Sequence, residues 1–154
     1  MKTLVDHINE ALKIGKNLSE WSSYSCQPKT KKELEQIIED RISKEGPNCD
    51  LNDIDVSLIE DMSYLFYGSK FDGDISRWDV SNVINMTGMF DRSKFNQDIR
   101  KWDVNKVKKM DFTFCFSKFN QDISQWNINK NCNTWFMFDL CPIKEEYKPK
   151  SLQS

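Results

Sequence analysis

The sequence predicts an α/β solenoid of tandem repeats, and three observations lead to this fold class. Residues of the same type recur every 24 positions between residues 48 and 143. Within each repeat, Met86, Met89 and Phe90 have the i, i+3, i+4 spacing of a helical turn, and an Ile-x-x-Trp segment that suits a short strand follows. A candidate capping helix precedes the repeats. A fixed period in the twenties is typical of a solenoid whose units pack on one another.

The 24-residue period is carried by six apolar columns in register. We expect each column to form a ladder through one core, in a leucine-rich-repeat-like right-handed solenoid of about four 24-residue coils with an N-terminal helical cap. This reading assigns the Trp column to the core rather than to sugar stacking. The columns are Phe66, Phe90, Phe114 and Phe138; Phe71, Phe95, Phe119 and Ile143; Trp78, Trp102 and Trp126; Leu51, Ile75, Ile99 and Ile123; Val56, Val80, Val104 and Ile128; and Met62, Met86 and Met110.

Three polar columns recur with the same period. Stacked coils lie roughly 5 Å apart, so like carboxylates repel unless each accepts hydrogen bonds from backbone N–H groups of its own turn. Turn capping is therefore the preferred interpretation. A calcium ladder is the alternative, although such ladders use paired glycines that this chain lacks. The columns are Asn48, Asp72, Asn96 and Asn120; Asp50, Asp74, Asp98 and Asp122; and Asp55, Asp79, Asp103 and Asn127.

Five segments follow from the pattern. Residues 1–16 are predicted to be an amphipathic helix and 17–29 a polar linker. Residues 30–46 form a capping helix, because Thr30-Lys31-Lys32-Glu33 matches a capping box and Gly46-Pro47 stops the helix. Residues 47–143 hold the repeats, and 144–154 are a charged tail.

Charge and cysteine usage exclude several classes of protein. Lys and Arg (22) nearly balance Asp and Glu (24), for a net charge of −2, so we expect neither nucleic acid nor a membrane as partner. The N-terminus has no apolar run typical of an export signal, and we expect a cytoplasmic protein. The five cysteines share no CxxC and no regular spacing, which indicates reduced thiols.

No candidate catalytic or cofactor site emerges. The single histidine, His7, lies far along the chain from the cysteines of the repeats, and no glycine-rich phosphate loop is present. Cys115, between Phe114 and Phe116, is expected to be a buried, inert thiol. We therefore expect a protein that is not an enzyme and that needs no cofactor.

Function is then expected on the variable surface and on the N-terminal helix. Arg77, Lys101 and Gln125 occupy one position that changes from repeat to repeat. A ridge of lysines in register offers a charged surface that selects a protein partner. The N-terminal helix offers an apolar face to a partner or to a second copy of the chain. The remaining candidate residues are Lys70, Lys94 and Lys118 on the ridge, and Leu4, Ile8 and Leu12 on the helix.

Three motifs carry a resemblance to a known family. Residues 78–86 (WDVSNVINM), 95–99 (FNQDI) and 119–126 (FNQDISQW) resemble the BspA-like leucine-rich-repeat surface-protein repeat, and the resemblance covers about residues 28 to 150. It implies little about activity, because fold and function are separable. Long members with export signals look like surface proteins and adhesins. Short members without a signal resemble proteins of gut bacteria and their phages.

The resulting expectation is a non-enzymatic protein–protein interaction module, encoded by a phage or mobile element and acting on a host protein in the host cytoplasm. Two alternatives stay open. One is a bacterial surface or adhesin-type repeat protein. The other is a solenoid that binds calcium or carbohydrate.

Overall fold

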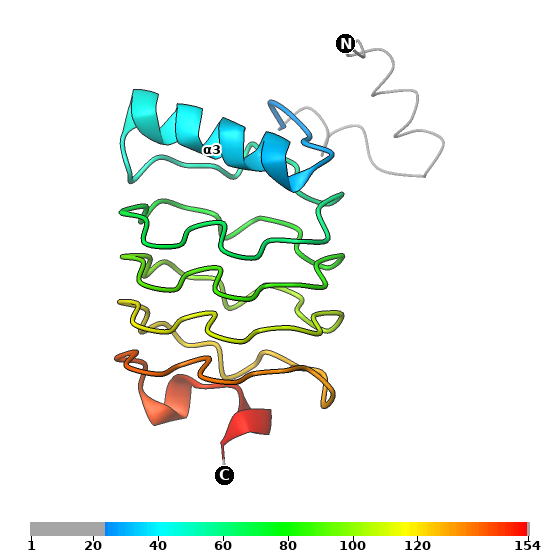
Figure 1. Cartoon of the computed structure of the whole chain (residues 1–154), viewed down its shortest axis with the longest axis vertical. Coiled ribbons are helices and arrows are strands. Elements are labelled where there is room, and N and C mark those ends of the chain that lie inside the picture. The colour runs from blue at the N-terminus through cyan, green and yellow to red at the C-terminus, as the bar shows by residue number, and fades with distance from the viewer. Residues whose placement is uncertain (1–23, 154) are drawn as a thin grey trace.

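The structure is a computed structural model that describes residues 24–153. Its elements are one α-helix, α3 (Lys31–Glu45), and two short 3-10 helices, η1 (Glu145–Tyr147) and η2 (Lys150–Leu152). Between them the chain runs through irregular turns that lie one below the next, with α3 across one end and η1 and η2 at the other (Figure 1). The predicted helix 1–16 lies outside the described residues, as do positions 17–23 of the predicted linker.

Helix α3 lies within the predicted range 30–46, and local side chains define its ends. The Thr30 side chain accepts a hydrogen bond from the Glu33 N–H at 3.2 Å. The Glu33 carboxylate in turn accepts from the N–H of Lys29, one residue before the position of an ideal capping box. The helix ends at Glu45, and the next residue, Gly46, is its C-cap with a φ of 91°. Its buried face, Leu34 and Ile38, belongs to the common core and fixes α3 over the first turn of the stack.

The predicted α/β solenoid is wrong. Within residues 24–153 there is no strand, and inside the repeats there is no helix. The only pairing of strand type in this part of the chain is a set of isolated parallel bridges, from Cys26 to Ile54 and then along the repeats. The leucine-rich-repeat-like alternation of short strands and helices is therefore not found there. The bridges of the repeats join Asp61 to Asn85, Asn85 to Lys109, and Lys109 to Asn133.

Left-handed residues explain why the helical spacing does not produce helices. Each repeat has two residues, four positions apart, with φ between 50° and 61°, a region that a right-handed helix cannot pass through. The chain instead forms consecutive β-turns, in which Leu65 N–H donates to Met62 O. A β-turn also brings residues three apart together, so the apolar spacing fits both structures. The left-handed pairs are Tyr64 and Gly68, Gly88 and Arg92, Phe112 and Phe116, and Phe136 and Leu140.

Backbone hydrogen bonds between repeats replace a sheet. We call residues 62–69 and their equivalents in the other repeats the turn segments. In a turn segment every second N–H donates to the following repeat, as the N–H of Phe66 does to Met89 O at 2.9 Å. The amides between them close the β-turns. In the first three repeats these backbone groups are thus satisfied without regular strands. In the last repeat, the equivalent N–H groups of Thr134, Phe136, Phe138 and Leu140 donate to no carbonyl of the described residues.

Aromatic ladders fill the core. The rings of Phe66, Phe90, Phe114 and Phe138 stack in succession, with centroids 5.5, 5.5 and 5.7 Å apart. The predicted assignment of the Trp column to the core is confirmed, because all three rings are buried. Each indole N–H also donates to a carbonyl oxygen of the preceding repeat, a link that the sequence did not reveal. The three acceptors are Leu51, Ile75 and Ile99 for Trp78, Trp102 and Trp126.

The aspartate columns cap turns, as predicted for two of the three columns. Asp122 Oδ1, for example, accepts from the Ser124 N–H at 2.9 Å, and Asp74 and Asp79 accept in the same way. For the remaining column, which contains Asp72, Asn96 and Asn120, the expectation of a hydrogen bond within the residue's own turn is wrong. There Asn96 accepts from the N–H of Asn120 at 2.8 Å, one repeat further on. That column therefore links neighbouring repeats. In the same way, Asp72 accepts from the N–H of Asn96, and Asn120 accepts from the N–H of Lys144.

Candidate interaction surface

Seven of the nine exposed large hydrophobic side chains of the described residues lie in the turn segments at one edge of the stack, and six of them, all but Trp135, form one cluster. Phe116 is 44% exposed and Phe136 59%. Clusters of exposed apolar side chains mark binding sites far more often than single exposed ones do. We call this cluster the aromatic edge. It consists of Tyr64, Tyr67, Phe112, Phe116, Phe136 and Leu140.

The left-handed backbone conformation of the turns directs these side chains away from the core and into solvent. Tyr64, Phe112 and Phe136 occupy the first left-handed position of their repeats. Phe112 and Phe136 stack with centroids 5.4 Å apart. Gly88 fills this position in the second repeat, where an added Cβ would lie 2.3 Å from Cε1 of Tyr64. The glycine therefore makes room for the Tyr64 ring, and the edge continues from one repeat to the next.

In the second repeat, the second left-handed position is occupied by a cationic residue, Arg92, which lies beside the aromatic edge. The guanidinium carbon of Arg92 lies 4.5 Å from the centre of the Phe116 ring, a cation–π contact. Asp91, beside Arg92, is mostly buried, and this burial raises the pKa of its carboxyl, with the positive charge of Arg92 opposing the shift. At the start of the edge, Tyr64 and Tyr67 meet edge to face at 6.0 Å.

A groove of about 430 Å³ separates helix α3 from the first part of the aromatic edge. Glu35, Ile38, Glu39 and Ile42 line it on the helix side, and the segment 64–67 with Ser69 lines the other. The groove therefore presents two carboxylates opposite two tyrosines.

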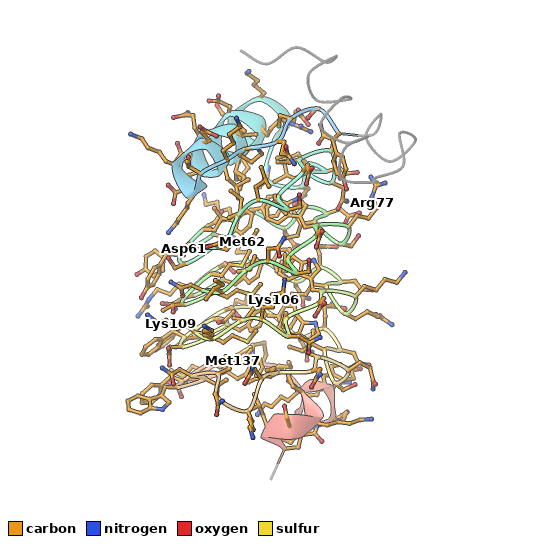
Figure 2. All side chains as sticks on the ribbon, turned by 90° about the vertical axis from the view of Figure 1, so that its right-hand side faces the viewer. Asp61, Met62, Arg77, Lys106, Lys109 and Met137 are labelled. Atoms are coloured by element: carbon orange, nitrogen blue, oxygen red, sulfur yellow. The ribbon has the colours of Figure 1, made fainter. Side chains whose placement is uncertain are left out.

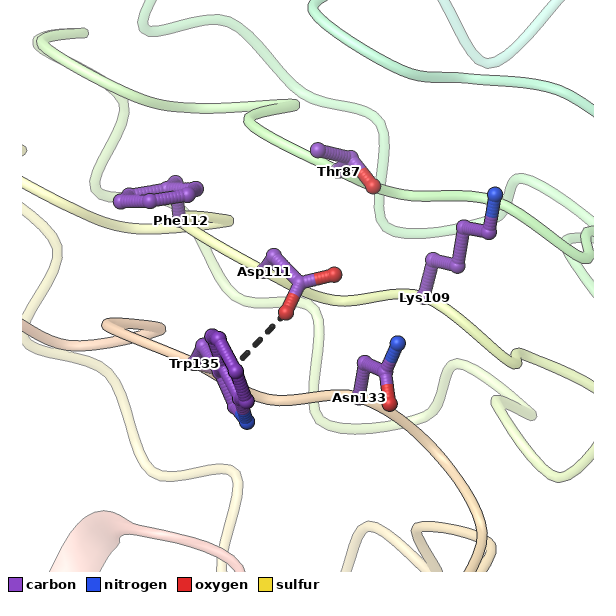
Figure 3. Close-up of a pocket in the computed structure, with 6 residues that line it drawn as sticks. All are labelled: Thr87, Lys109, Asp111, Phe112, Asn133 and Trp135. Carbon is purple, nitrogen blue, oxygen red and sulfur yellow. Dashed lines mark hydrogen bonds between the residues drawn. The ribbon is translucent and has the colours of Figure 1, made fainter.

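A second cavity, also of about 430 Å³, lies beside Phe112, and we call it the Trp135 pocket (Figure 3). Asp111 lies at its centre, and its Oδ1 accepts a hydrogen bond from the Trp135 backbone N–H at 3.1 Å. Trp135 is 74% exposed. The residues that line the pocket are Thr87, Lys109, Asp111, Phe112, Asn133 and Trp135.

The site residues predicted from the sequence do not belong to the aromatic edge. Some lie on another side of the stack, and others lie next to the aromatic edge. Arg77, Lys101 and Gln125 are exposed, and the first two line a small pocket of about 140 Å³ with Ser76 and Asp98. Figure 2 shows Arg77 on the opposite side of the stack from Asp61 and Lys109. The lysines of the ridge are exposed and follow the second left-handed position by two residues. They are Lys70, Lys94 and Lys118, whereas Leu4, Ile8 and Leu12 lie outside the described residues.

Sequence reasoning missed the aromatic edge. Cys115 is buried as expected, and burial raises the pKa of its thiol. Its neighbour Phe116, read as part of the same buried run, points outward instead. The available signal was a set of aromatic residues, such as Tyr64 and Phe112, that fall outside all six apolar columns.

Three further observations bear on chemistry. Within residues 24–153, no three His, Cys, Asp or Glu side chains are grouped so that they could hold a metal ion. No helix of the described part has the length and apolar character needed to cross a bilayer. All five cysteines are free thiols.

Comparison with known proteins gives a family. The model of the family described as "Mycoplasma protein of unknown function, DUF285" matches residues 32–147. No curated protein and no solved structure matches the chain. Because the match spans α3, all the repeats and η1, the chain belongs to the DUF285 family.

Proposed function

We propose that this chain is a non-enzymatic protein-interaction module that binds a partner protein through the aromatic edge. The observation that carries the proposal is that six of the nine exposed large hydrophobic side chains of the described residues form one cluster, the aromatic edge. Tyr, Trp, Phe and Arg are enriched at protein interfaces, and the few residues that dominate binding energy are drawn mainly from Trp, Tyr and Arg. Tyr64, Tyr67 and Arg92 supply such groups here.

The rigidity of the edge also favours binding. In every repeat but the last, its backbone amides alternate between bonds to the next repeat and bonds that close a turn, as those of Tyr64 and Tyr67 do. Phe112 and Phe116 are further held by ring stacking and by Arg92. Side chains that are fixed before binding lose less conformational entropy when the partner arrives.

Charge around the edge indicates the chemistry of the partner. Glu35 and Glu39 line the groove between α3 and the tyrosines. A partner segment with an apolar face and one or two basic residues would complement this groove. Lys94 and Lys118, which follow the second left-handed position of their repeats by two residues, would face acidic groups of the same partner.

The finer assignments are part of the proposal. The motifs at residues 95–99 and 119–126 support a repeat of the BspA-like kind, and a phage or mobile element is the origin that we propose for the gene. Five free thiols are typical of proteins in a reducing compartment, which supports action in the cytoplasm. The genes that flank the coding sequence test the origin.

Affinity capture from the lysate of the encoding or host cell tests the binding surface. Two double variants are compared with the wild type. One combines Phe116→Ser and Phe136→Ser in the aromatic edge. The other, the matched control, combines Arg77→Ser and Lys101→Ser on the opposite side of the stack. We expect a partner that co-purifies with the wild type and the control and is at least tenfold depleted with the Phe variant. Unchanged thermal unfolding shows that each variant is folded. Loss of the partner with the control alone would move the interface to Arg77 and Lys101, and capture of no specific partner would defeat the proposal.

A further inference from the structure

We infer that the Trp135 pocket is a binding site for a neutral saccharide. This inference does not rest on the proposed protein interaction, because it concerns a small polar ligand in one cavity. It rests on three features of the cavity, namely an exposed indole, a group of polar side chains with hydrogen-bonding capacity that the described residues leave unused, and a balanced charge.

The first feature is the indole. Trp135 is the most exposed of the large hydrophobic side chains described, at 74%. Its backbone is nevertheless fixed, because its N–H donates to Asp111 and its carbonyl accepts from Phe112 N–H at 2.9 Å. An aromatic ring on a fixed backbone gives a flat apolar surface for the C–H face of a pyranose ring. The Trp ladder of the core cannot serve this purpose, because its three rings are buried.

The second feature is a set of polar groups with unused hydrogen-bonding capacity. The Thr87 hydroxyl, the Lys109 ammonium, the Asn133 amide and Asp111 Oδ2 all line the pocket. In the portion of the chain that the structure describes, none of these four groups makes a hydrogen bond or an ion pair. Together they supply both donors and acceptors. A sugar hydroxyl also donates and accepts, so a polyhydroxylated ligand can satisfy the whole set.

The third feature is charge. Figure 3 shows Asp111 with one oxygen directed to the Trp135 backbone and the other toward the side where Thr87 and Lys109 lie. Lys109 and Asp111 carry opposite charges, so together they give the pocket no net charge that would attract a cationic or an anionic ligand over a neutral one. The pair therefore favours a ligand without net charge.

The size of the pocket fits the same ligand class. Its volume of about 430 Å³ lies in the range of small-molecule sites. The lining residues come from three successive repeats, with Thr87 in one, Lys109 and Asp111 in the next, and Asn133 and Trp135 in the third. A pocket of this size suits one or two sugar rings.

NMR titration of the full chain tests the inference. The probes are the methyl glycosides of glucose, galactose, mannose and N-acetylglucosamine, with glucuronate and N-acetyl-arginine amide as charged comparisons. We expect at least one neutral glycoside to shift the indole Nε1–H signal of Trp135 in a saturable way, and the charged compounds to bind at least tenfold more weakly. Trp135→Ala should abolish binding, and Asp111→Asn, which keeps the acceptor for the Trp135 N–H, should weaken it at least fivefold.

The matched control is Phe116→Ser, which alters the aromatic edge outside the pocket and should leave sugar binding unchanged. An absence of shifts up to about 50 mM of every neutral glycoside would overturn the inference. So would equal binding of the charged probes, or binding that survives Trp135→Ala. Because the Phe116→Ser and Phe136→Ser variant tests protein binding separately, failure of one proposal leaves the other standing.

Discussion

The indole N–H of Trp102 donates to the carbonyl oxygen of Ile75, 3.2 Å away in the preceding repeat. The Trp102 ring is only 4% exposed and lies 6.4 Å from the ring of Trp126 in the following repeat. One side chain thus touches the repeats on both sides of its own.

We expect Trp102→Ala to lower the free energy of unfolding by about 3–5 kcal/mol, the usual cost of removing a buried Trp. Trp102→Phe should cost about 1–3 kcal/mol, because it removes the indole bond to the Ile75 carbonyl, which keeps the Trp78 N–H as its donor, and fills less of the core. Urea unfolding followed by circular dichroism measures both. Trp135→Ala is the exposed control and should stay within about 0.5 kcal/mol of wild type. A loss below about 1 kcal/mol for Trp102→Ala would contradict the ladder.

Gly88→Ala should destabilise the chain more than Gly68→Ala does. Both glycines have a left-handed φ, near 60°, so alanine is strained equally at the two positions, by about 1 kcal/mol. Only the Cβ at position 88 meets a neighbour, the Tyr64 ring, whereas nothing lies within 4 Å of a Cβ at position 68. Thermal unfolding of the two variants isolates the cost of moving that ring.

The double variant Gly88→Ala with Tyr64→Ala provides the check. Removing the ring should recover the part of the loss that exceeds Gly68→Ala. Equal losses for the two glycine variants would show that the Tyr64 ring moves aside without cost.

Acid should weaken the fold partly through Asp122. Hydrogen bonds from the Ser124 N–H and hydroxyl lower the pKa of this carboxyl below its unfolded value. A carboxyl with a lowered folded pKa contributes stability above its unfolded pKa, and this contribution is lost as the pH falls through the folded pKa. Asp122→Asn keeps the acceptor for the turn but cannot titrate. Its stability should therefore fall less than that of wild type from about pH 5 to pH 2.

Urea unfolding at several pH values measures this difference. Asp122→Ala is the companion variant, because it removes the turn bond at every pH and should be less stable than Asp122→Asn throughout. Parallel pH profiles of the wild type and Asp122→Asn would show that this carboxyl has the same pKa in both states.

The thiols should react slowly in the native chain. Burial raises the pKa of Cys132 to about 11, with the negative charge of Asp111 adding to the shift. Burial also raises the pKa of Cys115 and Cys141. Since the thiolate is the reactive form, alkylation of these residues at pH 8 should be much slower in the native chain than in urea. Peptide mass spectrometry after timed iodoacetamide treatment measures each site, and native labelling of Cys132 at the unfolded rate would contradict the prediction.

The core could be read from the sequence, while the local backbone could not. A period of 24 residues identified the buried Phe, Trp and Met ladders, and Thr30 with Gly46 identified the ends of α3. Apolar residues spaced i, i+3, i+4 fit a helix and a pair of β-turns equally well. The left-handed φ of residues such as Phe112 determines that β-turns form and not a helix. The residue type of Phe112 does not predict this φ.

The candidate surface escaped sequence reasoning for the same reason. Whether Phe114 and Phe116 point inward or outward depends on that backbone geometry and not on their residue type. Charged variable positions such as Arg77 attracted the functional prediction because they are easily recognised as exposed. The structure adds an exposed surface made of residues whose type is ordinarily buried.

The contacts that join one repeat to the next recur in the same form along the stack, so the stack has a natural unit of length. Phe90 meets Phe114 as Phe66 meets Phe90, and the N–H of Asn120 finds Asn96 as that of Asn96 finds Asp72. Removing a whole unit of 24 residues would therefore rejoin matching surfaces, whereas removing 23 would put every ladder out of phase. Evolution or an engineer can thus shorten or extend this protein in whole repeats, while α3 at one end and η1 and η2 at the other stay unchanged.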